Sequence, residues 1–177
     1  MDPHFEFPPS PWVERFAAFI RPGGAVLDVA CGSGRHAAWL ARLGFEVDAV
    51  DRAPELFRDP PRGVTLLGAD LEAGPWPYAG RRFDAIVVTN YLHRPLLPVL
   101  AESLESGGVL IYETFARGNE RFGKPSRPEF LLAPGELLEV ARGRLRVIAY
   151  EDLVVDEPRP AAVQRLCARR EEPGSMG

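Results

Sequence analysis

The chain has 177 residues, of which 46% are hydrophobic and 26% charged, an ordinary globular composition that excludes a disordered, collagen-like or coiled-coil protein. Its formal net charge of −4 argues against a dedicated nucleic-acid binder, which usually carries a basic excess. No apolar run approaches the roughly 20 residues that cross a bilayer, and the start of the chain lacks the pattern of a signal peptide. The two cysteines form no disulfide framework and no paired Cys/His spacing indicates a metal. We therefore expect a cytoplasmic protein without a metal site or a membrane partner.

Strands and helices are predicted to alternate along most of the chain. Prolines keep residues 1–10 extended, and Ser10 followed by Pro11 is a favourable N-cap and first turn for a helix that ends near Ile20. Strands are predicted at 25–30, 45–51, 64–70, 83–90, 109–114, 145–152 and 161–171. Further helices are predicted at 35–43, near 54–58, from Pro95 to near Leu104 and from Pro134 to Ala141, with loops at 71–82 and 116–130.

This order predicts the topology. Alternating strands and helices form a parallel sheet with right-handed crossovers. The turn between the last two strands is too short for a crossover, so the last strand must run antiparallel to its neighbour. We predict an α/β fold with a doubly wound, mostly parallel sheet of seven strands, an antiparallel last strand and helices on both faces. The ligand-binding domain spans 25–171, residues 1–24 add a lead-in and a helix to it, and residues 172–177 form a frayed tail.

Polar residues follow five successive predicted strands. The first strand runs into Cys31-Gly32-Ser33-Gly34, and the next four end in Asp51, Asp70, Asn90 and Glu113. In an open doubly wound sheet, ligands bind at the carboxyl ends of the strands. Loops are often polar without binding anything, but five consecutive polar strand ends favour a binding site.

The first turn predicts the kind of ligand. Gly32 and Gly34 let the backbone approach a ligand closely, and the following helix directs its free N–H groups toward the same space. Asp51, at the end of the next strand, is placed to accept hydrogen bonds from a ribose diol. The pattern indicates an adenosine-containing cofactor. A dinucleotide is the rival, since Gly32-x-Gly34-x-x-Ala37 fits that fingerprint; the extra carboxylate of Asp28 and the antiparallel last strand oppose it.

The segment from Val26 to Asp51 resembles the first two motifs of the class I S-adenosylmethionine (SAM)-dependent methyltransferases. Gly-x-Gly-Arg-His, followed by Leu40, Gly44 and Val47, is most similar to the small tellurite-resistance and thiopurine-type branch. The resemblance extends over nearly the whole chain in strand order and is sharp only in this segment. It implies SAM as cofactor and S-adenosylhomocysteine as product.

The resemblance also implies the cofactor-binding residues. Ala30, Gly32 and Gly34 would line the methionine part and Asp28 would help to orient its amino end. Asp51 would hold the ribose hydroxyls, with Arg52 beside the adenine. Asp70 would accept a hydrogen bond from the adenine amino group, and the Leu71 N–H would donate to a ring nitrogen. The Asn90 carbonyl would lie beside the methionine moiety. Two neighbours complete the predicted set: Cys31, expected to fill a small-residue slot rather than to act as a nucleophile, and Arg35, which either reaches a carboxylate or points into solvent.

Four residues are candidates for catalysis. Glu113 is the preferred polar group, as a base or an orienting acceptor, and His93 could remove a proton or simply open a helix. Tyr91 either walls the methyl-transfer site or packs in the core. Arg117 belongs to a basic loop, with Arg121, Lys124 and Arg127, that could close over an anionic substrate or be an ordinary solvated surface.

The sequence also limits the acceptor. The fourth strand ends in Thr89-Asn90-Tyr91-Leu92, which is not the Asn/Asp-Pro-Pro-Tyr of enzymes that methylate amino groups in nucleic acids, and no Pro-Cys pair occurs. We predict a methyltransferase that acts on a small molecule at O, N, S or a metalloid, as a monomer or homodimer. The alternatives are a non-catalytic SAM-binding regulatory or partner subunit and, third, an NAD(P)-binding oxidoreductase.

Overall fold

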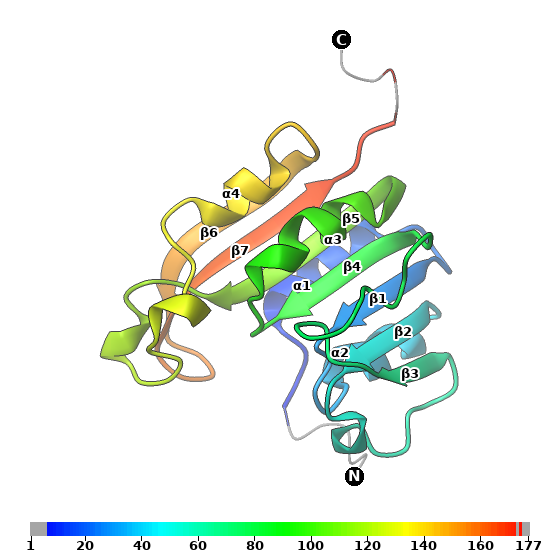
Figure 1. Cartoon of the computed structure of the whole chain (residues 1–177), viewed down its shortest axis with the longest axis horizontal. Coiled ribbons are helices and arrows are strands. Elements are labelled where there is room, and N and C mark those ends of the chain that lie inside the picture. The colour runs from blue at the N-terminus through cyan, green and yellow to red at the C-terminus, as the bar shows by residue number, and fades with distance from the viewer. Residues whose placement is uncertain (1–6, 173, 175–177) are drawn as a thin grey trace.

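The computed structural model describes residues 7–172 and 174, and it is built around one seven-stranded sheet (Figure 1). Part of the predicted lead-in and most of the predicted tail therefore lie outside the described residues. The strands lie in the order β3-β2-β1-β4-β5-β7-β6. They are β1 Ala25–Val29, β2 Glu46–Asp51, β3 Val64–Gly68, β4 Phe83–Thr89, β5 Leu104–Phe115, β6 Arg146–Val155 and β7 Ala161–Arg169.

The strand directions confirm the predicted fold. The strands from β3 to β5 pair in parallel, whereas β7 pairs antiparallel with both β5 and β6. β6 and β7 are antiparallel neighbours because the short connection between them permits only a hairpin, and β7 is the strand of this hairpin that pairs with β5. The sheet thus reverses its winding direction between β1 and β4, where neighbouring strands are followed by connections on opposite sides.

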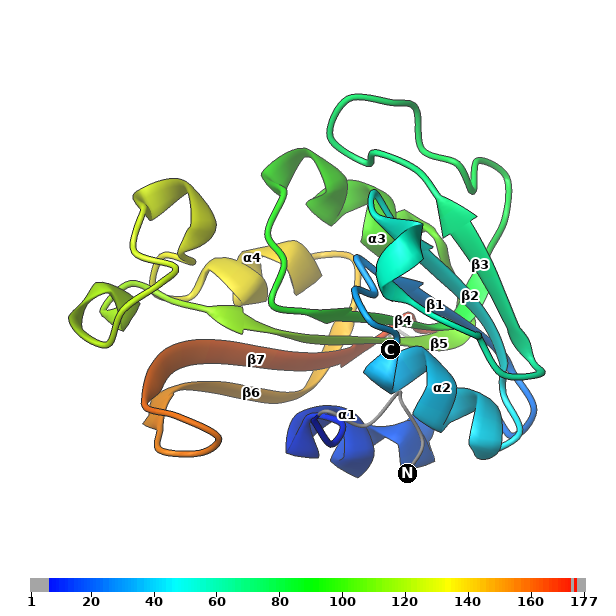
Figure 2. The ribbon, with the colours of Figure 1, turned by 90° about the horizontal axis from the view of Figure 1, so that it is seen from below.

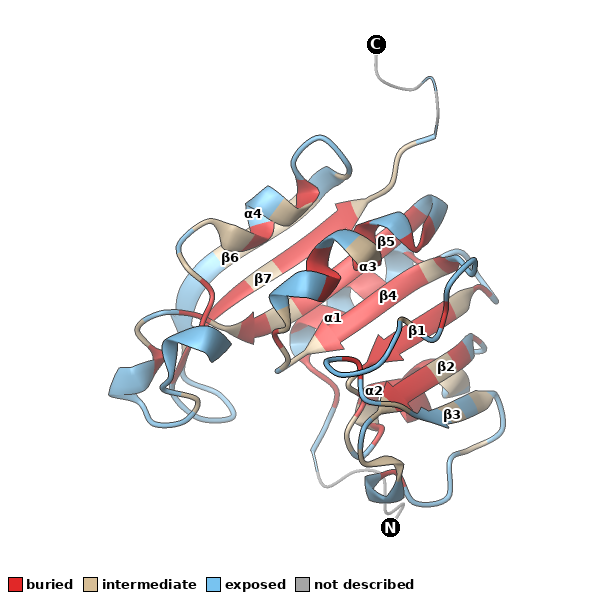
Figure 3. Ribbon diagram, viewed as in Figure 1, coloured by how far each residue is buried: buried red, intermediate tan, exposed pale blue. Residues whose placement is uncertain are grey.

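Helices cover both faces of the sheet, as predicted. Figure 2 shows α1 (Pro11–Phe16) and α2 (Arg35–Arg42) on one face, and α3 (Leu97–Glu102) and α4 (Glu136–Ala141) on the other. Each face has its own apolar cluster, one built around Trp12, Phe16 and Leu40, the other around Phe83, Leu100 and Tyr112. The central strands are buried between the two clusters, and exposure increases toward the edge strands β3 and β6 (Figure 3). No helix in the described part of the chain is long and apolar enough to cross a membrane.

Several predicted boundaries differ from the structure. The first helix ends at Phe16 and continues to Phe19 as a 3-10 turn, instead of reaching Ile20 as an α-helix. β5 begins at Leu104, earlier than predicted, because Leu104 pairs with Phe83. The helix predicted from Pro95 to near Leu104 ends at Glu102, and beyond it the Gly107 N–H donates to the Arg170 carbonyl at 2.7 Å and extends the sheet. The loop between β3 and β4 contains no helix, as its Gly and Pro content predicts.

Candidate functional site

A cleft of about 630 Å³ lies along the carboxyl ends of β1 to β5. That volume lies within the range of small-molecule sites. The cleft brings together seven of the sequence-predicted residues: Ala30, Asp51, Arg52, Asp70, Leu71, Asn90 and Tyr91. The other predicted residues do not line it: Asp28, Cys31, Gly32, Gly34, Arg35, His93, Glu113 and Arg117. Residues that the sequence did not single out complete the lining: Ala53, Leu56, Ala69, Glu72, Leu92, Thr114, Phe115, Pro125 and Phe130.

Asp51 connects the glycine turn to the end of β2. One carboxylate oxygen accepts from the Gly32 N–H and the other from the Ala53 N–H, each at 2.9 Å. A carboxylate offers about four lone-pair directions, so two remain for a ligand. The side chain is only partly buried and faces the cleft. Asp51 can therefore hold the turn in place and accept hydrogen bonds from two hydroxyl groups at the same time.

The backbone is strained at two cleft positions. Ala30 and Asn90 follow the adjacent strands β1 and β4, and both have a φ of 54°. A left-handed conformation costs a non-glycine residue about 1–2 kcal/mol, and such strain concentrates at binding and catalytic sites. The Asn90 N–H donates to the Glu113 carbonyl at 2.9 Å, which ties this turned backbone to β5. The strained turns direct both residues into the cleft.

Gly34 is required by its conformation and by its surroundings. It precedes α2 with a φ of 81°, and a Cβ atom built there would lie 2.3–2.4 Å from the ring of Phe57. The Phe57 ring is buried against the turn, so the second glycine of the motif accommodates this ring as well as a positive φ. Arg35, the next residue, donates to the Pro8 carbonyl at 2.9 Å and thereby fastens the segment before α1. Its burial lowers the pKa of the guanidinium.

Asp28, on β1, holds the first turn of α2 by a hydrogen bond. The side chain is buried, and its carboxylate accepts from the Ala37 N–H, in the first turn of α2, at 3.1 Å. Burial raises the pKa of Asp28 to about 7, against the opposing effects of the Ala37 hydrogen bond and the Arg35 charge. Asp28 therefore contacts the helix that carries the motif rather than the open cleft, and burial favours its protonated form.

The Asp28 carboxyl predicts how stability depends on pH. Its folded-state pKa of about 7 exceeds the value of about 3.9 for an unfolded aspartate, so the folded protein holds the extra proton between these values. The titration of Asp28 therefore lowers the free energy of unfolding as the pH rises from about 4 to about 7. Above about pH 7 this contribution to the free energy of unfolding changes little. Asp28→Asn keeps the size and an acceptor for Ala37 but removes the titration. In urea unfolding, we expect this variant to gain stability relative to the wild type between about pH 5 and about pH 8; a difference that does not change with pH would contradict this assignment.

Glu113 belongs to a polar network on the α1 side of the sheet. One carboxylate oxygen accepts from the Ser10 hydroxyl at 2.7 Å, and the other accepts from Arg165 Nε in an ion pair. Arg165 also donates to Glu151 at 3.1 Å. The Glu113 and Arg165 side chains are only 13% and 17% exposed. The preferred catalytic candidate thus has both oxygens engaged by the segment before α1 and by β7, outside the cleft lining.

His36 extends this network to the end of β4. Its Nε2 accepts from the Ser10 N–H at 3.0 Å, and its Nδ1 lies 3.4 Å from the Thr89 hydroxyl. Burial, reinforced by the Arg35 charge, lowers the pKa of His36 to about 3, so the ring is neutral. Since Nε2 accepts, the proton resides on Nδ1. His36 therefore packs behind the residue that precedes the strained Asn90.

Of the other catalytic candidates, Tyr91 alone lines the cleft. Its hydroxyl donates to Glu72 at 3.4 Å, and burial and the Glu72 charge raise its pKa, so it stays protonated. His93 precedes a 3-10 turn without capping it, and Arg117 is exposed. Burial also raises the pKa of the Cys31 thiol, as expected of a packing residue rather than a nucleophile.

An aromatic wall, which the sequence did not reveal, forms the far end of the cleft. This wall consists of Phe115, Pro125 and Phe130, and Arg94 holds the backbone on both sides of Phe130. The Arg94 guanidinium donates to the carbonyls of Glu129 at 3.0 Å and Leu131 at 2.9 Å, on both sides of Phe130. It also binds both carboxylate oxygens of Glu136, at 2.6 and 3.1 Å. The only early signal was the predicted loop over 116–130.

Comparison with known proteins agrees with this geometry. Residues 26–108 match the family model described as a methyltransferase domain. The chain is 36% identical over 102 residues to a protein-L-isoaspartate O-methyltransferase from Gloeobacter violaceus, covering 54% of this chain and 49% of that protein. It is 32% identical over 110 residues to a ubiquinone biosynthesis O-methyltransferase from Cereibacter sphaeroides, covering 56% and 44%. The chain thus spans about half the length of these curated relatives.

Solved structures show the same fold. TehB from Haemophilus influenzae superposes with a TM-score of 0.73 and 20% identity, over 90% of this chain and 61% of that one. A TehB-like SAM-dependent methyltransferase from Corynebacterium glutamicum gives a TM-score of 0.66 and 20% identity, over 90% and 87%. Together with the family match, these structures confirm the predicted resemblance: the chain has the fold of the class I SAM-dependent methyltransferases, a class whose cofactor is SAM.

Proposed function

We propose that the protein transfers a methyl group from SAM to a small-molecule acceptor by in-line displacement. The observation that carries this proposal is a single cleft with two chemically different halves. Strand-end carboxylates line one half and aromatic side chains line the other, with the strained Asn90 between them in the chain. A cofactor and an acceptor can therefore lie in contact within one cleft.

The polar half suits the adenosine part of SAM. Asp51 retains two lone-pair directions for the ribose hydroxyls, and Arg52 lies beside it for the adenine face. One oxygen of Asp70 accepts from the Glu72 and Ala73 N–H groups at 2.9 and 3.2 Å, which orients the carboxylate. The other oxygen would accept from the adenine amino group, and the Leu71 N–H would donate to a ring nitrogen.

The glycine turn and the Asn90 backbone would hold the methionine part. Ala30 and Asn90 line the cleft with positive φ values, and Gly32 and Gly34, also with positive φ, form the turn that follows Ala30. Because Asp28 is buried against Ala37, it would position this turn through α2 rather than touch the amino end directly. Cys31 would keep the turn packed, and Arg35 would anchor the segment before α1.

The aromatic half supports catalysis by positioning. SAM supplies an electrophilic methyl group; the acceptor's lone pair attacks it as the carbon–sulfur bond breaks. Alignment of the reacting atoms alone can lower the barrier by about 7–11 kcal/mol. Phe115, Pro125 and Phe130 carry no titratable group, and the Tyr91 hydroxyl, which donates to Glu72, could accept a hydrogen bond from the acceptor. His93, Arg117 and Glu113 would influence the reaction only through the elements that they hold.

The aromatic wall also favours a methyltransferase over the two alternative functions. A non-catalytic SAM-binding subunit requires no apolar chamber next to the cofactor half, and this cleft has one. An NAD(P)-dependent oxidoreductase fits less well, because the chain has the antiparallel β7 of the methyltransferase fold. SAM and the acceptor would share a cleft of about 630 Å³, which favours a small molecule as the acceptor and partner.

Phe130→Ala is expected to raise the KM for an accepted small molecule about tenfold and to leave SAM affinity unchanged. Loss of an apolar ring contact of this size is worth roughly 1.5 kcal/mol, which corresponds to that factor. Phe122→Ala is the matched control, since Phe122 belongs to the same loop with similar exposure (42% against 45%) but lies outside the cleft lining. Transfer of labelled methyl groups from SAM to a panel of small phenols, amines and thiols supplies the measurement. Equal KM values for both variants would remove Phe130 from the acceptor site.

A further inference from the structure

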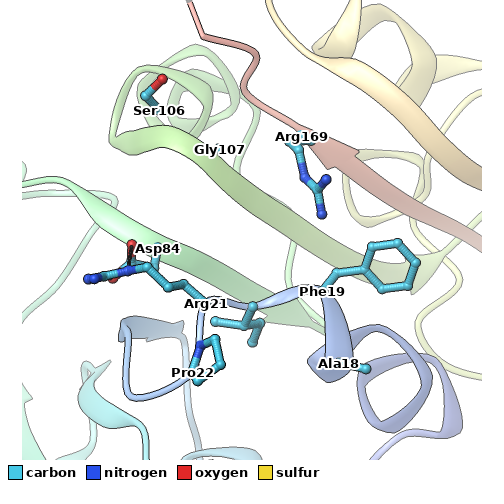
Figure 4. A pocket seen from close by; sticks show the side chains of 9 residues that line it. Ala18, Phe19, Arg21, Pro22, Asp84, Ser106, Gly107 and Arg169 are labelled. Atoms are coloured by element: carbon cyan, nitrogen blue, oxygen red, sulfur yellow. Dashed lines mark hydrogen bonds and ion pairs between the residues drawn. The ribbon is translucent and has the colours of Figure 1, made fainter.

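A second cavity, of about 450 Å³, lies at the amino-terminal end of β4, whereas the cleft lies at the carboxyl ends of the parallel strands. Figure 4 shows it between the end of α1's 3-10 extension, the start of β4, the glycine turn in β5 and the end of β7. Its lining residues are Ala18, Phe19, Ile20, Arg21, Pro22, Asp84, Ser106, Gly107 and Arg169. The proposed methyl transfer uses none of them.

Arg169 lines this cavity, and its guanidinium is not fully hydrogen-bonded within the protein. Its Nε atom is buried and has no hydrogen-bond partner. Buried polar groups are nearly always hydrogen-bonded, and an unsatisfied one is costly, more so when it is charged. Within the described part of the chain, no ion pair involves Arg169. The guanidinium carbon lies 5.7 Å from the centre of the Phe19 ring, and Figure 4 shows the two side chains around the same space.

The carboxylate in the cavity is already occupied. Asp84 accepts two hydrogen bonds from Arg21, each at 3.1 Å, and a third from the Ala25 N–H at 2.8 Å. These contacts hold the pKa of Asp84 below its usual range despite partial burial, so its charge is matched by Arg21. Arg169 therefore leaves a net positive charge in the cavity. Arg146, opposite Arg169 on β6, is paired with Glu171 at 3.2 Å and lies outside the cavity lining.

We propose that this cavity binds a small organic oxyanion, a carboxylate or phosphate monoester with an apolar body. The terminal N–H groups of Arg169 form a planar edge that matches two oxygens of such a head group. Phe19, which is 42% exposed, and Pro22 supply the apolar wall for the body. Since the cavity and the cleft lie at opposite ends of β4, this ligand should bind without displacing SAM. The inference does not depend on the proposed methyl transfer.

Titration with four probes, followed by backbone amide NMR, tests this inference. The probes are benzoate, phenyl phosphate, benzyl alcohol and acetate, and the reporters are the amides of Phe19 and Gly107. We expect an oxyanion with a ring to shift these amides at about millimolar concentration, and benzyl alcohol and acetate to bind at least about tenfold more weakly. Comparison of benzoate with phenyl phosphate identifies the preferred head group.

Variants connect the binding to Arg169. Arg169→Gln should weaken binding of the preferred probe at least about tenfold, whereas Arg146→Gln, which removes a neighbouring arginine outside the cavity, should change it less than about twofold. Phe19→Ala should weaken binding without abolishing the preference for an oxyanion. Added S-adenosylhomocysteine should leave the probe's affinity unchanged. The inference is overturned if neither oxyanion shifts these amides at about 10 mM, if benzyl alcohol binds as well as benzoate, or if Arg169→Gln, still folded by its amide spectrum, binds like the wild type.

Discussion

Asp51→Ala is expected to weaken SAM binding by about tenfold to a hundredfold. Hydrogen bonds to a charged acceptor are each worth about 1.5–3 kcal/mol, and the loss of two ribose contacts reaches at least the lower part of this range. The same substitution frees the Gly32 and Ala53 N–H groups from their 2.9 Å contacts, so the turn under the ligand also loosens. Calorimetric titration with SAM measures the effect.

Asp48→Ala is the matched control for this variant. Asp48 lies on the same strand, but its carboxylate pairs with Arg81 at 2.8 Å and does not line the cleft. We expect its SAM affinity to equal that of the wild type. Asp51→Asn should fall between the two, because it retains one acceptor oxygen and loses the charge. Wild-type affinity in Asp51→Ala would mean that the end of β2 does not hold the cofactor.

Glu113→Gln is expected to lower the free energy of unfolding by about 2–3 kcal/mol. Its carboxylate joins Ser10, before α1, to Arg165 on β7, and both charged side chains are largely buried. Removing one partner of a buried ion pair commonly costs about 3–5 kcal/mol, and the loss is smaller here because Arg165 keeps its contact with Glu151. Urea denaturation measures this change, and Glu105→Gln, an exposed position on the same strand, is the control.

Turnover of the same variant separates a structural role from a catalytic one. If Glu113 holds α1 and β7 together, Glu113→Gln should retain SAM affinity and a wild-type pH profile, with activity reduced only as far as the fold loosens. A stable Glu113→Gln protein whose turnover falls more than about a hundredfold would instead assign it the general-base role that its strand-end position suggests.

The sequence predicted the features that depend on local pattern. Strand and helix alternation, the short turn before β7 and the glycine turn at Gly32 and Gly34 each involve residues close together in the chain. Asp51 was placed correctly because the end of β2 must lie next to the turn that follows β1 in a parallel sheet. These local signals were sufficient to predict the sheet and to bring Asp51, Asp70 and Asn90 to one end of its strands, while their roles in binding stay predictions.

The rest depended on contacts between distant residues. Successive strand residues face opposite sides of a sheet, so Thr114 reaches the cleft while the adjacent Glu113 points toward α1. Its partner Arg165 lies 52 residues away, and no spacing rule connects the two. The aromatic wall likewise requires Arg94 to hold the backbone around Phe130, a contact between segments that are far apart in the chain. Only the folded structure brings these groups together.

Calorimetric titration of the purified protein with SAM, S-adenosylhomocysteine and NAD in parallel tests the central claim most directly. The polar half of the cleft, with Ala30, Asp51 and Asp70, should bind both adenosyl-sulfur ligands and discriminate against NAD. Saturable one-to-one binding of SAM and S-adenosylhomocysteine, without a response to NAD, is the predicted result. Binding of NAD in preference to SAM, or no binding of any of the three, would contradict the proposed methyltransferase function.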